Sequence, residues 1–189
     1  MALHTSSTAT LTITIALALA VNPHIASEWI RVLDSGPGVF VIKDAFPDHS
    51  CLDGVTSAFG RIIAEEEELL GGDGDHFSAA GNNSRIWNAQ EKLCVREPEL
   101  FVRYYNNPVF TAVCRSWLGP DFQVTSQVNS SHPGSAAQDP HCDYHLGFRS
   151  NEQVTEYPSH VHKMSQYLTL QGAIAHVDMP LETGERRGR

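Results

Sequence analysis

Apolar residues recur at offsets of three and four in the segment that follows Cys51. The positions are Leu52, Val55, Phe59, Ile62 and Ile63. This spacing predicts an amphipathic helix that ends at Gly71-Gly72, because glycine commonly terminates helices. The four consecutive carboxylates Glu65 to Glu68 are expected to form its solvated end.

Two further helices are predicted over residues 97–105 and 108–118. The second has Pro108 in its first turn, where the missing amide hydrogen is tolerated. Gly119-Pro120 follows directly and provides a stop signal. The segment 71–84, rich in Gly, Asp, Asn and Ser, is expected to be a loop.

Three segments have the pattern of strands. Residues 38–43 form a short apolar run between Gly and Asp, and residues 168–177 form a longer one with Gly172 in its middle. Residues 122–129 alternate between apolar and polar side chains, so Gln127 and Asn129 share one polar face. That face either meets solvent or lines a polar cavity. Helices that precede strands in this way favour an α+β fold with the helices packed outside a sheet.

The composition narrows the classes of function. With 189 residues and 41% hydrophobic residues, the chain is long enough and apolar enough for one folded domain. A formal net charge of −9 without a Lys/Arg stripe argues against nucleic-acid binding. The four scattered cysteines contain no C-x-x-C pair and favour free thiols in a cytoplasmic protein.

The apolar run Leu11 to Val21 leaves two interpretations open. Its length and its Ala18-Leu19-Ala20 resemble a secretory signal, but no Lys or Arg precedes it. It is too short for a stable membrane span. Its alternating Thr and Ile also suit a strand, so a secreted protein remains the alternative to a cytoplasmic one.

The candidate metal ligands are His141 and Asp143. Residues i and i+2 of an extended segment point to the same side, so this imidazole and carboxylate could bind one ion. They would supply two ligands of the facial triad of two His and one carboxylate that suits non-haem Fe(II). His145 lies too far along such a strand to complete the same site.

Other histidines provide competing candidates. His176-Val177-Asp178 repeats the H-x-D pattern at the end of an apolar segment, and it could equally be a hydrogen-bonded structural pair. His160 and His162 follow another predicted loop and form a second i, i+2 pair, which is either a separate metal site or two loop or surface histidines. No G-x-S-x-G elbow, Walker loop or G-x-G-x-x-G motif is present.

Long stretches of the chain resemble phytanoyl-CoA dioxygenase-like proteins. The run from Thr125 to Phe148, which contains His141-Cys-Asp143, is similar to the segment that leads into the iron motif of that family. Gly38–Phe46 resembles its opening strand, and Leu168–Gly184 resembles the strand and turn after the metal motif. The similarity spans roughly residues 36–184.

The resemblance implies a double-stranded β-helix, the jelly roll of cupin-like proteins. It also implies an oxygenase in which His141 and Asp143 hold Fe(II) and 2-oxoglutarate chelates the metal, with Gln127 and Asn129 facing the cavity. Members use O2 to convert 2-oxoglutarate to succinate and to hydroxylate a small-molecule substrate. The metal carries this chemistry, and the protein supplies geometry and excludes water.

The two ends of the chain depart from the family pattern. Residues 1–27 match nothing recognised, residues 28–184 form the partial family domain, and residues 185–189 form an unrelated tail. The distal iron histidine and the basic residue for 2-oxoglutarate are not found. The expectation is therefore a C-terminally truncated, incomplete barrel that binds Fe(II) weakly without turnover. The alternative function is a non-catalytic β-helix remnant or binding module.

Overall fold

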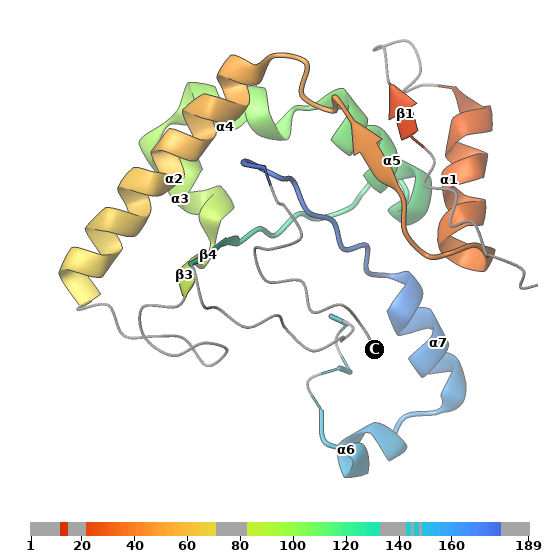
Figure 1. Cartoon of the computed structure of the whole chain (residues 1–189). Coiled ribbons are helices and arrows are strands. Elements are labelled where there is room, and N and C mark those ends of the chain that lie inside the picture. Colours follow the sequence, from red (N-terminus) through yellow and green to blue (C-terminus); the bar gives the residue numbers. More distant parts are fainter. Residues whose placement is uncertain are drawn as a thin grey trace, which may run out of the picture. The chain divides into compact units, whose positions relative to one another are not determined.

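The computed structural model describes residues 12–14, 22–70, 83–132, 143–144, 146–147 and 149–178 (Figure 1). The architecture is α+β, as predicted, and the described strands form two small sheets of two strands each. The chain divides into two compact units. Unit 1 combines residues 1–47 with residues 106–122, and unit 2 combines residues 48–105 with residues 123–189.

Unit 1 contains a parallel strand pair and two helices. Its elements are β1 (Thr12–Thr14), α1 (Pro23–Ser35), β2 (Val41–Lys43) and α5 (Pro108–Leu118). β1 pairs with β2 in a parallel register that matches Thr12 with Val41. Within the apolar run at the N-terminus, the described residues therefore form a strand, which is one of the two interpretations that the sequence allowed.

The helices of unit 1 share one apolar core that contains Trp29. Trp29 of α1 and Val109 of α5 are both buried and belong to the same apolar core. The ring of Trp29 stacks on Phe40, with centroids 5.7 Å apart and planes 7° from parallel. Burial of such large rings is the main stabilising contribution to a small core of this kind.

Unit 2 contains the remaining described elements. They are α2 (His49–Leu70), β3 (Asn83–Ile86), α3 (Ala89–Arg96), α4 (Pro98–Tyr105), β4 (Val128–Ser131), α6 (Asn151–Thr155) and α7 (Ser159–Tyr167). β3 and β4 are antiparallel, with Asn83 opposite Ser131 and Ile86 opposite Val128.

The predicted apolar face of α2 is the centre of the unit 2 core. Val55 and Ile62 are fully buried, as are Ile86 of β3 and Leu93 of α3. Helix α2 packs against α3, α4 and β3. Gly54 permits a close approach of α4, since a Cβ atom at this position would lie 3.2 Å from Leu100 Cδ1. The helical periodicity of this segment therefore predicted its packing face correctly.

The acidic end of α2 is mostly exposed, as predicted, and two of its carboxylates also pair with basic residues of the neighbouring helix. Glu65 Oε2 accepts a hydrogen bond from Arg96 Nη2 at 2.9 Å, and Glu66 pairs with Lys92. Both basic residues belong to α3. Because opposite charges on neighbouring helices attract, this carboxylate run helps to align α2 with α3, although each pair that is partly exposed contributes modestly.

The two longer strand predictions are only partly realised. Residues 122–127 form no strand, and β4 begins at Val128. Residues 168–178 form neither a helix nor a strand. β3 begins within the segment expected to be a loop, and α6 and α7 were not predicted. β3 pairs with β4, which lies far along the chain, so local composition did not indicate it.

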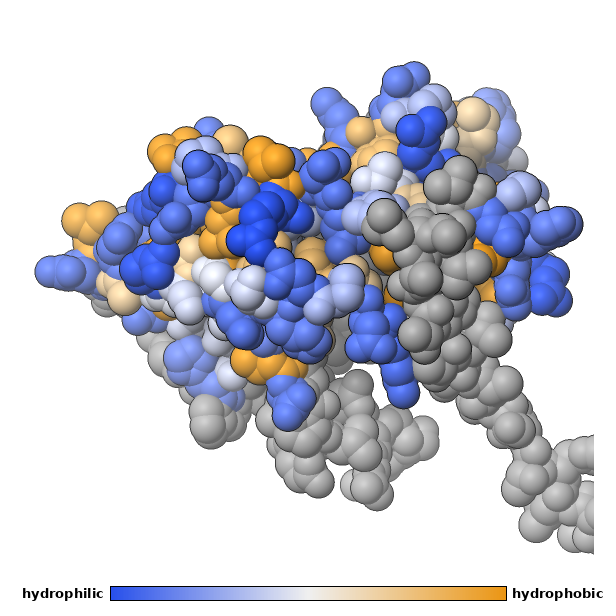
Figure 2. Space-filling model, turned by 90° about the horizontal axis from the view of Figure 1, so that it is seen from above, coloured by the Kyte–Doolittle hydropathy of each residue, from blue (hydrophilic) through white to orange (hydrophobic). Residues whose placement is uncertain are grey.

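The surface carries dispersed apolar side chains. Among the described residues, the most exposed large apolar side chains are those of Leu69, Val95, Leu168 and Val177. Figure 2 shows, on the face seen from above, separate apolar groups between polar ones. None of the described helices combines the length and the apolar character that a bilayer crossing requires.

Candidate metal and cosubstrate site

Gln127 and Asn129 lie on one face of the segment that enters and forms β4. Both side chains are exposed, while Val128 between them is partly buried. The alternation predicted from the sequence is therefore present at these positions. Asn129 pairs in register with Arg85 of β3. The ladder sets the direction of the Asn129 side chain, and Gln127, directly before β4, is exposed as Asn129 is.

Asp143 lies outside any strand, directly before a turn. The amide of Gly147 donates to the carbonyl of Tyr144 at 2.8 Å, which closes this turn. Leu146 is 1% exposed and attaches the turn to the interior of unit 2. Asp143 was expected in an extended strand and lies instead in irregular backbone. Burial of Leu146 holds this part of the backbone in place.

The carboxyl group of Asp143 has a side-chain partner far along the chain. Gln171 Nε2 donates a hydrogen bond to Asp143 Oδ2 at 2.8 Å. Asp143 is partly buried and Gln171 is exposed. An amide donor of this kind fixes the orientation of a carboxyl group without adding a charge.

His141 and His145 lie outside the described residues. The proposed convergence of His141 with Asp143 therefore stays a prediction. Within the parts of the chain that the structure describes, no group of three or more His, Cys, Asp or Glu side chains could hold a metal ion. Asp143 itself fits the requirement of Fe(II) for a hard oxygen ligand with a hydrogen-bonded partner.

His176 has a structural role rather than the role of an open ligand. Its Nδ1 lies 2.9 Å from Thr56 Oγ1, and its Nε2 lies 2.9 Å from the hydroxyl of Tyr104. The ring also contacts Phe59, with centroids 5.8 Å apart. Both ring nitrogens have hydrogen-bond partners, which supports the structural interpretation of the His176-Val177-Asp178 pattern.

The surroundings of His176 favour neutral side chains. Burial lowers the pKa of His176, because the imidazolium form loses solvation. Burial also raises the pKa of Tyr104, because the phenolate loses solvation in the same way. The pair is therefore held as a neutral imidazole and a neutral phenol.

The second candidate pair, His160 and His162, belongs to helix α7 rather than to a loop. Side chains two positions apart on a helix do not face each other, so these imidazoles do not form a common metal site. His162 Nε2 lies 3.0 Å from the carbonyl oxygen of Tyr157 and can donate to it. His160 is exposed.

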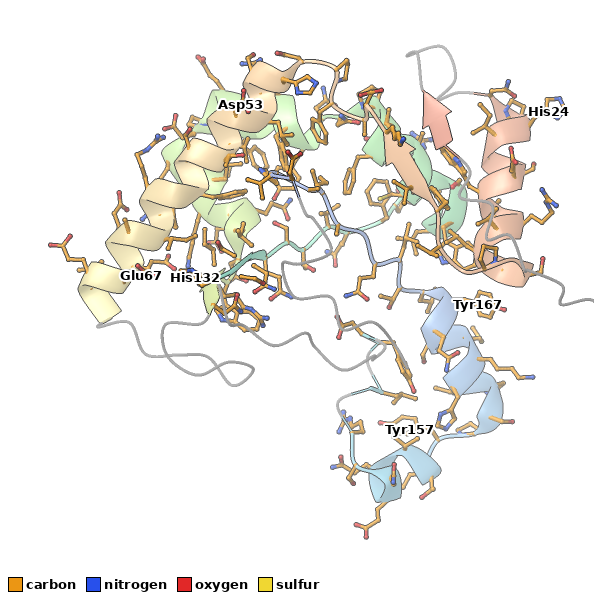
Figure 3. The ribbon with its side chains drawn as sticks, viewed as in Figure 1. His24, Asp53, Glu67, His132, Tyr157 and Tyr167 are labelled. Atoms are coloured by element: carbon orange, nitrogen blue, oxygen red, sulfur yellow. The ribbon has the colours of Figure 1, made fainter. Side chains whose placement is uncertain are left out.

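A second polar cluster joins α2, β3 and the end of β4. Ser84 Oγ donates to Glu67 Oε1 at 2.7 Å and lies 3.0 Å from His132 Nε2 (Figure 3). Because the single hydroxyl proton is directed to Glu67, His132 serves as the donor to Ser84. In a hydrolase triad the carboxylate contacts the histidine instead. This cluster therefore fits a structural link between the elements, not a nucleophile.

Comparison with known proteins places the chain in a family. The profile of phytanoyl-CoA dioxygenase (PhyH) matches residues 36–184. The chain therefore belongs to the phytanoyl-CoA dioxygenase family, which confirms the resemblance seen in the sequence. Searches of curated proteins and of solved structures gave no match. The matched range includes the motif with His141 and Asp143 as well as Gln171 and His176.

Gln171 is the residue near the candidate site that the motif analysis missed. Gln171 is a polar side chain within the apolar run 168–177. In the structure most of this segment is exposed, so the polarity of Gln171 alone does not point to a partner. Its partner, Asp143, is 28 positions away and could not be identified from local sequence.

Proposed function

We propose that this chain is an Fe(II)- and 2-oxoglutarate-dependent dioxygenase that hydroxylates a small molecule. The observation that carries the proposal is the family match over residues 36–184, which includes His141-Cys-Asp143. Family membership supports an oxygenase in general, and the residues of this chain support the more specific assignment. The fold that we propose for the complete site is the double-stranded β-helix of the family.

His141 and Asp143 are the proposed protein ligands of the metal. A neutral imidazole and a carboxylate suit Fe(II), and oxygenases of this class keep metal positions open for small ligands. Gln171 supports the assignment of Asp143, because ligating carboxylates are commonly oriented by hydrogen bonds from a neighbouring side chain.

Gln127 and Asn129 are the proposed cosubstrate-binding residues. Their amides share one face and can donate hydrogen bonds to a carboxylate such as those of 2-oxoglutarate. When bound, the iron supplies the redox chemistry that couples decarboxylation of 2-oxoglutarate to hydroxylation of substrate. The protein side chains bind and orient the cosubstrate and keep water away from it.

The proposal is tested by anaerobic loading of the 189-residue chain with Fe(II), followed by 2-oxoglutarate and oxygen. Weak Fe(II) binding, and at most weak succinate formation that depends on iron and oxygen, is the expected result, because the distal iron histidine and the basic residue for 2-oxoglutarate were not identified in the sequence. His141→Ala and Asp143→Ala are expected to abolish it. His160→Ala is the matched control, because His160 lies exposed on α7 and should leave succinate formation unchanged.

Two outcomes would contradict the proposal. Succinate formation that persists in both ligand variants would show that other residues hold the metal. Iron binding and succinate formation that are both absent in the folded wild-type chain would favour the alternative, a binding module without turnover.

A further inference from the structure

Gln171 and Asp143 make a direct contact between distant parts of unit 2. The separation of 2.8 Å between Gln171 Nε2 and Asp143 Oδ2 is that of a well-formed hydrogen bond. Asp143 lies in irregular backbone before a turn. The hydrogen bond from Gln171 acts directly on the carboxyl group of Asp143 and favours one orientation of it.

The backbone that carries Gln171 is also irregular. Residues 168–178 follow α7 without forming a helix or a strand (Figure 1). A donor on such a segment can orient its acceptor only if the segment itself is held in place. His176, five positions after Gln171, provides this attachment.

The hydrogen bonds of His176 define one consistent arrangement of protons. Thr56 Oγ1 donates to the carbonyl of Leu52 at 2.8 Å, so its proton is not directed to His176. His176 Nδ1 therefore carries the proton and donates to Thr56 Oγ1. Tyr104 then donates its hydroxyl proton to Nε2 of the neutral ring.

This arrangement attaches the segment to two helices at once. Thr56 belongs to α2 and Tyr104 to α4, and the ring of Phe59 on α2 adds an apolar contact. Gln171 and His176 lie on the same irregular segment, and His176 contacts the two helices while Gln171 contacts Asp143.

We infer that Gln171 is a positioning residue that orients Asp143 for metal binding, and that His176 holds its segment on α2 and α4. This inference rests on the proposed function of Asp143 as a metal ligand. Partners of this kind typically change metal affinity by about 10–100-fold when they are removed.

The decisive variant is Gln171→Glu, which conserves size but replaces the amide donor with a carboxylate. Co(II) is the probe, because its visible absorption responds to the ligands around the metal. We expect Gln171→Glu to weaken Co(II) binding by about 10–100-fold and to shift the absorption band of the bound ion. Gln166→Glu on α7 is the matched control, since it makes the same charge change at an exposed glutamine.

A second measurement detects the contact without a metal. In the apo protein, the side-chain amide resonances of Gln171 should shift in the Asp143→Ala variant, while those of Gln166 should not. Circular dichroism and thermal unfolding of Gln171→Glu should match the wild type, because Gln171 is exposed. Loss of fold cannot then explain weaker Co(II) binding.

The outcomes separate this inference from the proposed function. If Asp143→Ala abolishes Co(II) binding and Gln171→Glu leaves both affinity and absorption unchanged, the positioning role is wrong and the metal site stands. If Asp143→Ala binds Co(II) as the wild type does, the proposed metal site is wrong and the role of Gln171 falls with it. Unchanged Gln171 resonances in apo Asp143→Ala would also overturn the contact.

Discussion

Tyr104 and His176 form a hydrogen bond of 2.9 Å between a phenol and an imidazole that are both partly or fully buried. The contact joins α4 to a segment 72 positions later in the chain. Because burial disfavours the charged form of each ring, the bond depends on both side chains remaining neutral.

Acidification is expected to destabilise the protein through His176. Its ordinary pKa of 6.5 applies in the unfolded chain, and burial lowers the pKa in the folded chain. Below about pH 6.5 the unfolded state takes up this proton first, so the free energy of unfolding falls as the pH drops towards the folded pKa. Above about pH 6.5 His176 is neutral in both states, and its contribution to the free energy of unfolding is fully present. Urea unfolding between about pH 8 and pH 5 measures the trend.

The control for this pH dependence is a variant that cannot titrate at the same position. His176→Gln should lose part of the acid sensitivity, whereas His160→Gln should keep it, because His160 is exposed on α7. Parallel pH profiles for the wild type and His176→Gln would contradict the prediction.

Tyr104→Phe is expected to lower the free energy of unfolding by about 1–3 kcal/mol. The substitution keeps the ring and removes only the hydroxyl that donates to His176 Nε2, which leaves a polar atom without its donor. In a chain that already carries His176→Phe, the Tyr104→Phe substitution should lower the free energy of unfolding by less. Urea unfolding of the two single variants and the double variant measures this coupling, and an additive result would contradict it.

Glycine-to-alanine substitutions are expected to have opposite effects at two positions. Gly119, after α5, has a φ angle of +87°, which an L side chain rarely adopts, so Gly119→Ala should destabilise by about 1–3 kcal/mol. Gly60 lies within α2 with nothing within 4 Å of an added Cβ, so Gly60→Ala should stabilise by about 0.5–1 kcal/mol. Thermal unfolding of both variants tests the signs, and a destabilised Gly60→Ala would be the contrary result.

Asn107→Ala is expected to destabilise unit 1 more than Asn22→Ala does. Asn107 Oδ1 caps α5 by accepting from the amides of Val109 and Phe110, and its Nδ2 donates to the carbonyl of Ala45 at 2.7 Å. Asn22 caps α1 by one exposed bond to His24. Loss of a cap costs about 0.5–2 kcal/mol, and Asn107 loses a further buried contact. Equal unfolding midpoints for the two variants would contradict this ranking.

Helices with strong local signals were predictable from the sequence. The apolar spacing from Leu52 to Ile62 identified the buried face of α2, and Pro108 and Gly119 marked the two ends of α5. α1 was not predicted, although it carries a similar signal, since Asn22 caps it and Pro23 begins it. In these cases the information lies within a few turns of one helix.

Pairings between distant residues could not be predicted in the same way. β3 lies where Asn83 and Ser84 suggested a loop, and its strand character comes from its ladder with β4. α7 was not predicted, although Val161, Met164 and Leu168 recur at offsets of three and four, because a helix of nine residues contains few repeats of this pattern. Gln171 and Asp143 meet for the same reason that β3 and β4 do, through tertiary structure that local patterns do not encode.

The division of unit 1 between two separate stretches of the chain has a consequence for synthesis. Trp29 of α1 shares its core with Val109 of α5, and α5 leaves the ribosome only after all of α2, β3, α3 and α4. Domains generally acquire their structure in the order in which they are translated. The nascent α1 therefore lacks the contact with Val109 until α5 has emerged from the ribosome, and before then Phe40 is already available to stack on Trp29.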